Sequence, residues 1–245
     1  MTFLNINHTP HAELRRKVIQ TALKMNGLGI NHGKSGNVSA RIAGGFLITP
    51  TGIAYEDTKP EQIVEMRIDG SPERSFDGRY EGHILPSSEW RFHRGIYAAR
   101  PDVAGIVHTH STFATTLACM VTVIPAFHYM IAVAGGADIR VAPYATFGSQ
   151  ALSDHAVAAL TDRSACLLAQ HGMICTGDAL DTALALAVEV ESLSRMYWQA
   201  LQIGTPPILT AAEMTLVIEK FKTYGQQNLS PAPPEKTLQV NNSST

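Results

Sequence analysis

The sequence lacks any long uninterrupted apolar run. Glycine, histidine, threonine or a charged residue breaks each apolar stretch well short of the ~20 residues that a membrane-spanning helix needs. Residues 1–16 also contain no apolar core of the kind that a signal peptide carries. From sequence alone we therefore expect a cytoplasmic protein that does not associate with membranes.

The sequence also lacks an excess of charge of either sign. Lysine and arginine number 19 against 21 aspartate and glutamate residues, so the formal net charge is −2. The basic residues form no stripe, so the sequence predicts no positively charged surface that would attract nucleic acids or anionic membranes. These counts argue against a nucleic-acid-binding protein and favour a small-molecule partner.

Cysteine is scarce, with only Cys119, Cys166 and Cys175 in the chain. Their number is odd, no pair has C-x-x-C spacing, and each lies among apolar neighbours. A disulfide framework is thereby excluded, and we expect three buried free thiols in a reducing compartment.

What the chain does have is enough apolar material for one large core. Of 245 residues, 45% are apolar, and helical and strand patterns interleave with several short turns. This predicts a single domain over 1–225, built as a three-layer α/β/α sandwich around a mixed, mostly antiparallel sheet. Residues 226–245 are polar and predict a disordered tail. The expected helices cover 13–28, 87–99, 112–120, 149–160, 178–203 and 213–224, and the expected strands 37–41, 45–49, 63–68, 103–108, 139–143 and 165–168.

The most informative motif is His108-Thr109-His110, which follows the apolar run 103–107. Side chains two apart on a strand point the same way, so both imidazoles would lie side by side at a strand end. Glu89 at an expected helix start and His171 after another apolar run would complete a metal-ion shell of three imidazoles and a carboxylate. A pair of solvated or core-capping histidines is the simpler alternative for the H-x-H motif.

Three short segments are suited to holding an anion because they combine glycine or hydroxyl groups with little side-chain bulk. They contain Gly36 and Asn37, Thr51 and Gly52, and Ser87 and Ser88. The serines fall at an expected helix N-terminus, where free N–H groups favour an anion. Each segment also has an ordinary explanation as a cap or a turn, and spacing alone does not show that they converge.

Eight segments together resemble the class II aldolases of the aldolase/adducin family, most closely the bacterial L-fuculose-1-phosphate aldolases. The resemblance runs from about residue 13 to 225 and implies the α/β/α fold expected above. The segments are SGNVS (35–39), LITPTG (47–52), LPSSEWRFH (85–93), VHTH (107–110), IPAFHYMI (124–131), APYATFG (142–148), QHG (170–172) and KFKTYG (220–225).

The resemblance also implies roles for individual residues. It implies one Zn²⁺ per subunit, a substrate phosphate, a tyrosine proton donor at Tyr129 and a fourfold homotetramer. Phe221 and Tyr224 match a C-terminal element that closes over a neighbouring subunit's site. The implied zinc ligands are Glu89, His108, His110 and His171, and the implied phosphate groups belong to Gly36, Asn37, Thr51, Gly52, Ser87 and Ser88.

The implied reaction is metal-dependent cleavage of a ketose 1-phosphate to dihydroxyacetone phosphate and an aldehyde, with Glu89 as the base once substrate displaces it from the metal. The sequence departs from the fuculose enzymes at the long loop over 71–85, at Thr109 and at Ala169-Gln170. These departures leave the identity of the aldehyde product undetermined. A 5-deoxyribulose or 5-methylthioribulose 1-phosphate salvage aldolase would share every motif. Glu89 argues against a pentulose-phosphate 4-epimerase, which carries an aspartate there. A methylthioribulose-phosphate dehydratase is an alternative of the same rank. The intact ligand set argues against a metal-free adducin-like scaffold.

Overall fold

The structure is a computed structural model that describes residues 10–69 and 84–224. Most of the loop expected over 71–85, and the whole tail expected over 226–245, lie outside the described residues. No helix within the described residues combines the length and the apolar character that crossing a bilayer requires.

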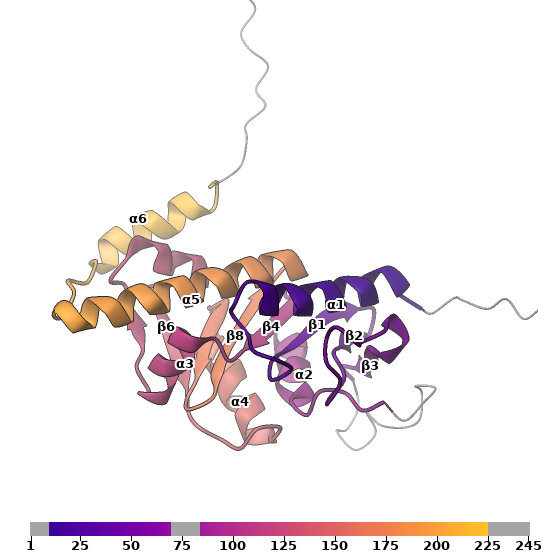
Figure 1. The fold of residues 1–245 in the computed structure, drawn as a ribbon. Helices are drawn as coiled ribbons and strands as arrows, with labels where there is room; N and C mark the ends of the chain where they lie inside the picture. The colour runs from indigo at the N-terminus through magenta and orange to yellow at the C-terminus, as the bar shows by residue number, and fades with distance from the viewer. Residues whose placement is uncertain (1–9, 70–83, 225–245) are drawn as a thin grey trace, which may run out of the picture.

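An eight-stranded sheet organises the described residues, in the order β3-β2-β1-β4-β8-β7-β6-β5 (Figure 1). Only the β6–β7 pair is parallel. The expectation of a mixed, mostly antiparallel sheet is confirmed. The strands are β1 (Asn37–Ile42), β2 (Gly45–Ile48), β3 (Val64–Arg67), β4 (Gly105–Thr109), β5 (Ile124–Pro125), β6 (Asp138–Ala142), β7 (Ala165–Leu168) and β8 (Gly172–Gly177).

Helices cover both faces of this sheet, which gives the expected three layers (Figure 1). One apolar core lies under α1, α3 and α5, and a second lies under α2 and α4. The helices are α1 (Ala12–Gly27), α2 (Trp90–Ala99), α3 (Thr112–Cys119), α4 (Gln150–Ala159), α5 (Leu180–Ile203) and α6 (Ala211–Phe221), with 3₁₀ turns η1 (Pro60–Gln62) and η3 (Tyr129–Ala134).

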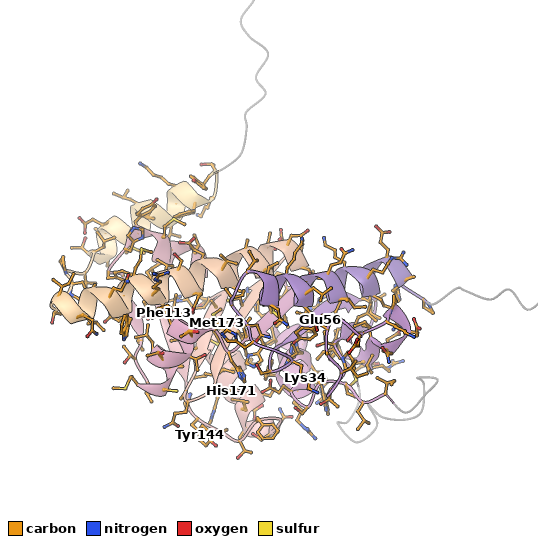
Figure 2. The ribbon with its side chains drawn as sticks, viewed as in Figure 1. Lys34, Glu56, Phe113, Tyr144, His171 and Met173 are labelled. Carbon is orange, nitrogen blue, oxygen red and sulfur yellow. The ribbon has the colours of Figure 1, made fainter. Side chains whose placement is uncertain are left out.

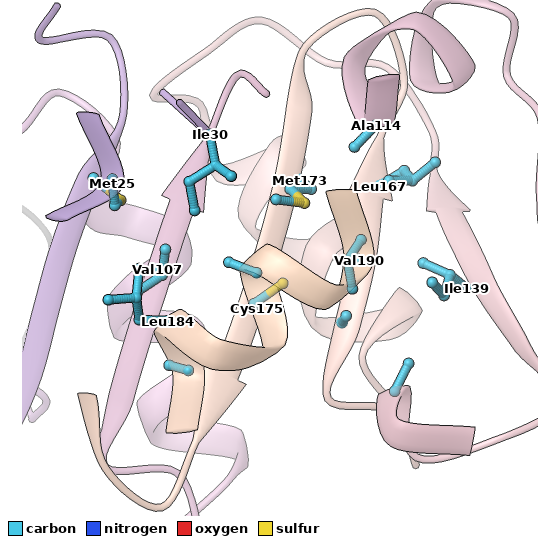
Figure 3. Packing of buried hydrophobic residues seen from close by; sticks show 14 of the residues in the cluster. Met25, Ile30, Val107, Ala114, Ile139, Leu167, Met173, Cys175, Leu184 and Val190 are labelled. Carbon is cyan, nitrogen blue, oxygen red and sulfur yellow. The ribbon is translucent and has the colours of Figure 1, made fainter. Parts of the chain in front are cut away.

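The strands divide their side chains between the two cores by strict alternation. On β4, Val107 joins the core under α5 and Ile106 joins the core under α2; on β8, Met173 and Ile174 divide in the same way. Figure 3 shows Val107 and Met173 in the core under α5. Because His108 is two residues after Ile106, its imidazole lies on the α2 face, where it meets Phe92 edge-on at 5.3 Å between ring centroids.

Three expectations about local structure were wrong. Strand β8 was missed, because its short apolar run lies between two glycines that suggested turns. Helix α2 begins at Trp90 instead of residue 87, because Ser87 N–H bonds to Thr49 O at 3.0 Å and Pro50 bridges Pro86, which keeps this segment extended. Finally, Cys119 is exposed, whereas Cys166 and Cys175 are buried as expected.

The start of α3, just after His110, is fixed by a carboxylate from α5. Glu191 accepts hydrogen bonds from Ser111 Oγ at 2.7 Å and from the backbone N–H groups of Phe113 and Ala114, both at 2.9 Å. These N–H groups are among the donors that a helix N-terminus leaves free, so Glu191 supplies the cap that the Ser111 side chain does not.

We expect Glu191→Ala to destabilise the fold by about 1–3 kcal/mol, because it leaves two helix-end N–H groups and a buried hydroxyl without their acceptor. Urea unfolding of the metal-free protein measures this loss. Glu189→Ala is the matched control, since it removes a half-buried carboxylate two residues away on the same helix. Equal midpoints for the two variants would show that Glu191 is not a cap.

Candidate active site

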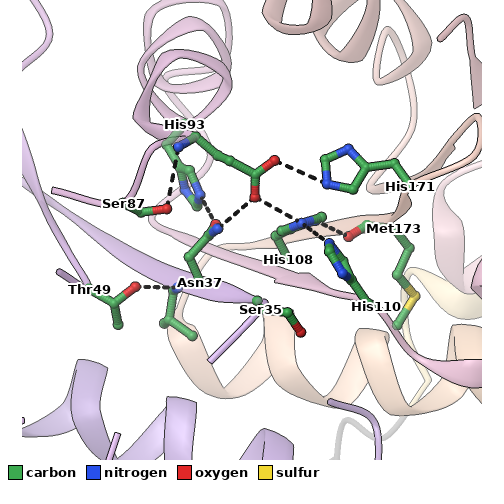
Figure 4. Close-up of polar contacts among 12 residues, drawn as sticks. Ser35, Asn37, Thr49, Ser87, His93, His108, His110, His171 and Met173 are labelled. Carbon is green, nitrogen blue, oxygen red and sulfur yellow. Dashed lines mark hydrogen bonds and ion pairs between the residues drawn. The ribbon is translucent and has the colours of Figure 1, made fainter. Parts of the chain in front are cut away.

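Pairing between β4 and β8 brings the three predicted histidines together. His108 lies opposite Ile174 and Thr109 opposite Met173, so the end of β4 carrying His108 and His110 adjoins the turn that carries His171. Glu89, the residue that precedes α2, reaches the same point from the α2 face. One ligand atom from each of these four residues lies within 4.8 Å of the others (Figure 4).

Two glycines allow the chain to approach this closely. A Cβ at Gly172 would lie 2.4 Å from Thr109 O and 2.9 Å from His110 Cδ2, and a Cβ at Gly36 would lie 2.5 Å from His108 O. All three separations are too short for any side chain. The glycines of the QHG and SGN segments are therefore required by contact with the histidine strand.

The polar contacts show that the cluster needs a cation. His108 Nδ1 lies 2.9 Å from Met173 O, a pure acceptor, so this nitrogen carries a proton. His108 Nε2 then faces Glu89 Oε2 at 3.1 Å and His110 Nε2 at 3.1 Å. Lone pairs on these atoms repel one another unless a proton or a metal ion lies between them.

The electrostatics of the cluster keep two of its candidate ligands, Glu89 and His110, deprotonated. Burial raises the pKa of Glu89, but His108 and His171 outweigh burial and hold that pKa well below its usual range. Burial, helped by His108 and His171, lowers the pKa of His110 to about 4. Carboxylate and neutral imidazole are the forms that bind metals, so proton competition for these two ligands is weak near neutral pH.

The buried Oε1 atom of Glu89 accepts no well-aligned hydrogen bond among the described residues, although His171 Nε2 lies 3.0 Å away. An acceptor without a donor and converging imidazole nitrogens fit a divalent transition metal. Three nitrogens and one carboxylate oxygen are a set that zinc accepts, and a displaceable carboxylate leaves room for substrate.

The three candidate anion-binding segments meet beside this cluster. Lys34 Nζ donates to Gly52 O at 2.8 Å, Ser87 N–H bonds to Thr49 O at 3.0 Å, and the Asn37 side chain reaches Glu89. Ser88 is exposed and lines the same cavity as Glu89, and Gly52 has a φ of 74°, which suits glycine. The predicted phosphate groups therefore lie together although they are far apart in sequence.

A cavity of about 290 Å³ opens over the candidate metal cluster formed by Glu89, His108, His110 and His171. Its mouth carries the rings of Tyr144 and Phe147, which are 60% and 65% exposed. Figure 2 shows Tyr144 and His171 at the same edge of the molecule. The cavity is lined by Ser35, Ser88, Glu89, His110, Tyr144, Ala145, Phe147, Gln170 and His171.

Tyr129 does not line this cavity. Its ring is 51% exposed and stacks near Phe221 at 6.4 Å between centroids, and Phe221 in turn lies 5.4 Å from Tyr224. This aromatic cluster lies beside α6, on the side of α5 away from His171 (Figures 1 and 2). Tyr129, the predicted proton donor, thus lies in one cluster with the predicted lid residues Phe221 and Tyr224. All three lie away from the four candidate metal ligands of the same chain.

Sequence reasoning placed Asn37 at the phosphate but missed its contact with Glu89, and it gave His93 no role. Asn37 Nδ2 donates to Glu89 Oε2 at 2.9 Å, and the fully buried His93 contacts Asn37 in turn. The signal for His93 was its position four residues after Glu89, which places both on one side of the first turns of α2.

Comparison with known proteins gives one consistent picture. The model of the class II aldolase and adducin N-terminal domain matches residues 16–198. The chain belongs to the class II aldolase/adducin family. The recognition made from the motifs is thereby confirmed.

Two curated relatives and a solved structure illustrate the similarity. A 5-methylthioribulose-1-phosphate/5-deoxyribulose-1-phosphate aldolase of Rhodospirillum rubrum is 53% identical over 90% of this chain and 96% of its own. An L-fuculose phosphate aldolase of Escherichia coli is 49% identical over 87% of this chain and 96% of its own. A solved L-fuculose 1-phosphate aldolase superposes with a TM-score of 0.81 at 38% identity, over 88% of this chain and 99% of that one.

These relatives confirm the expectation of a class II aldolase, a lyase, at the level of enzyme class. The three sugar phosphates named in the sequence analysis, those of L-fuculose, 5-deoxyribulose and 5-methylthioribulose, all occur in the names of these relatives. The metal itself, the residues that act and the number of subunits are taken up below as proposals.

For this family member we expect zinc to raise the thermal midpoint of the metal-free protein. Zinc at a hundred times its dissociation constant adds about 2.7 kcal/mol, which for a chain of this size shifts the midpoint by about 5–10 °C. The shift should vanish in His108→Ala, because that variant loses a buried ligand. His32→Ala is the control, as His32 is exposed and outside the cluster. A full shift in His108→Ala would contradict the ligand assignment.

Proposed function

We propose that this protein is a zinc-dependent aldolase that cleaves a ketose 1-phosphate to dihydroxyacetone phosphate and an aldehyde. One Zn²⁺ per subunit is held by Glu89, His108, His110 and His171. The observation that carries the proposal is the convergence of these four ligands beside a cradle of backbone amides and hydroxyls. A metal-free scaffold would have no use for acceptor atoms packed this closely.

The bound metal supplies a Lewis acid that stabilises negative charge developing on the substrate oxygens. Glu89 moves the proton at carbon 3: in the condensation direction its carboxylate removes that proton from dihydroxyacetone phosphate. In cleavage the same group returns it. The low pKa of Glu89 keeps the carboxylate ionised before substrate binds, and displacement toward substrate gives it the position of a base.

The phosphate of the substrate is bound by Gly36, Asn37, Thr51, Gly52, Ser87 and Ser88. This set consists of amides and hydroxyls that donate hydrogen bonds, a suitable environment for a dianion. The aldehyde half is then directed toward the mouth of the cavity, where the exposed Tyr144 and Phe147 rings face an apolar substituent such as a methyl or methylthio group. We also place the enzyme in the cytoplasm, where its free thiols stay reduced.

A substrate panel tests this activity. We expect zinc-loaded protein to release dihydroxyacetone phosphate from L-fuculose, 5-deoxyribulose or 5-methylthioribulose 1-phosphate, measured by coupled reduction of the product. The free ketoses should react at least about a hundredfold less efficiently, because two charge-assisted hydrogen bonds are each worth 1.5–3 kcal/mol. Zinc-loaded Glu89→Gln is the matched negative control. Equal rates on phosphorylated and free sugars would contradict the phosphate cradle.

The aromatic cluster of Tyr129, Phe221 and Tyr224 supports a fourfold homotetramer in which these residues act on the neighbouring subunit's site. Tyr129 is exposed and absent from the lining of its own cavity, yet a proton donor must touch its substrate. A neighbouring copy is the arrangement that brings it there. Tyr129 would protonate the aldehyde oxygen in condensation, while Phe221 and Tyr224 close over the same site.

Subunit mixing tests this arrangement. Tyr129→Phe and Glu89→Gln should each lose most activity, about 10²–10⁴-fold, because each lacks one proton-transfer group. Refolded one-to-one mixtures should regain about one quarter of wild-type activity, since a hybrid site can take Glu89 from one subunit and Tyr129 from the next. Mixtures that stay as inactive as the separate variants would place Tyr129 and Glu89 in the same subunit's site.

A further inference from the structure

A continuous chain of buried polar side chains ends on Glu89. It begins at Tyr97 on α2, passes through Ser39 on β1 and His93 on α2, and reaches Glu89 through Asn37 (Figure 4 shows its last steps). The successive separations are 2.9 Å, 2.6 Å, 2.5 Å and 2.9 Å. Exposure of the four residues behind Glu89 does not exceed 2%, so the chain excludes water from each step.

The ionised carboxylate fixes the direction of every hydrogen bond in this chain. Because Glu89 Oε2 only accepts, Asn37 must present its Nδ2 to Glu89 and its Oδ1 to His93. His93 Nε2 therefore donates to Asn37, and its Nδ1 accepts from the Ser39 hydroxyl. Ser39 then accepts from Tyr97.

The opposite orientation of Asn37 would place two acceptors 2.9 Å apart, at Oδ1 of Asn37 and Oε2 of Glu89. That arrangement would cost the full desolvation of both groups in a dry site. Burial, with His108 nearby, lowers the pKa of His93 to about 3, so its imidazole is neutral and has one donor and one acceptor, as the chain requires.

From this geometry we infer that His93 is a positioning residue that locks the Asn37 amide and, through it, aims the Glu89 carboxylate. The inference rests on the proposed function, in which Glu89 is both ligand and base. Oε2 is shared between Asn37 and His108, while Oε1 faces His171. In the proposed reaction Asn37 keeps its hydrogen bond to the carboxylate when substrate takes the place of Glu89 on the metal, and it limits the positions that the base can take.

Asn37 also belongs to the proposed phosphate cradle, which gives the chain a second consequence. The backbone of the Gly36-Asn37 turn meets the phosphate, and the side chain of the same residue holds the base. Binding of the phosphate and orientation of Glu89 are therefore coupled through one residue. Interactions that act on the base in this way appear in kcat more than in KM.

The test compares His93→Leu with His93→Gln. Leucine removes both hydrogen-bonding atoms, whereas a glutamine amide places one donor and one acceptor at the end of a side chain that can reach Asn37 and Ser39. Both proteins are loaded with Co²⁺, and the visible absorption spectrum, the Co²⁺ dissociation constant, kcat and KM are measured at temperatures where both are folded.

For His93→Leu we expect a changed cobalt spectrum and a loss of about 10- to 100-fold in Co²⁺ affinity or kcat, the range typical of groups that support metal ligands. KM should change by less than about threefold, since the effect falls on the base. His93→Gln should recover the wild-type spectrum and most of the activity.

A lowered thermal midpoint with unchanged cobalt spectrum, affinity and kcat in His93→Leu would show that His93 is only a core residue and would overturn the inference. The same holds if His93→Gln recovers nothing while folding normally. Failure of the wild-type protein to cleave any ketose 1-phosphate would refute the proposed function instead, and the cobalt spectra would still report on the chain from His93 to Glu89.

Discussion

The antiparallel pairing of β4 with β8 is the constraint on which the site depends. Its register sets His108 opposite Ile174 and carries the end of β4 to the turn that holds His171. A slip by one residue would send His108 into the core under α5 and bring Thr109 to the metal-binding face. The two apolar cores enforce the register, because Ile106 and Val107 must each stay on their own face. Packing energy thereby fixes the positions of the three proposed histidine ligands, which would repel one another in the absence of a cation.

The fourth proposed ligand comes from the adjoining helix layer and is held by different means. Glu89 precedes α2 and is positioned by Asn37, which belongs to β1, the strand next to β4. Strand β1 also pairs Asn37 with His108 in register. The carboxylate, the amide that holds it and the imidazole that faces it are thus fixed by one strand pair and one helix. The β1–β4 pair and the start of α2 thus determine the orientation of the Glu89 carboxylate, the proposed base.

The parts of this site that sequence predicts are those that depend on short-range periodicity. The alternation in His108-Thr109-His110 predicted one face for two ligands, and the layer order followed from interleaved helices and strands. Strand β8 was missed because its apolar run is short and bounded by glycine, yet it is the partner that makes His171 a neighbour. The convergence of Asn37 with Glu89, and the separation of Tyr129 from both, arise from tertiary packing, and no local pattern encodes them. Resemblance to a family identified these residues, but only the structure showed which of them lie together.

Exchange of the carbon-3 protons of dihydroxyacetone phosphate with D₂O tests the account most directly. The proton signal at carbon 3 is followed by NMR with zinc-loaded protein and no aldehyde. If Glu89 is a base aimed by its surroundings, one of the two protons should exchange with wild-type protein, and exchange should be lost in zinc-loaded Glu89→Gln. Exchange that persists unchanged in Glu89→Gln, or cleavage of a ketose 1-phosphate by wild-type protein without any exchange, would contradict the role assigned to this carboxylate.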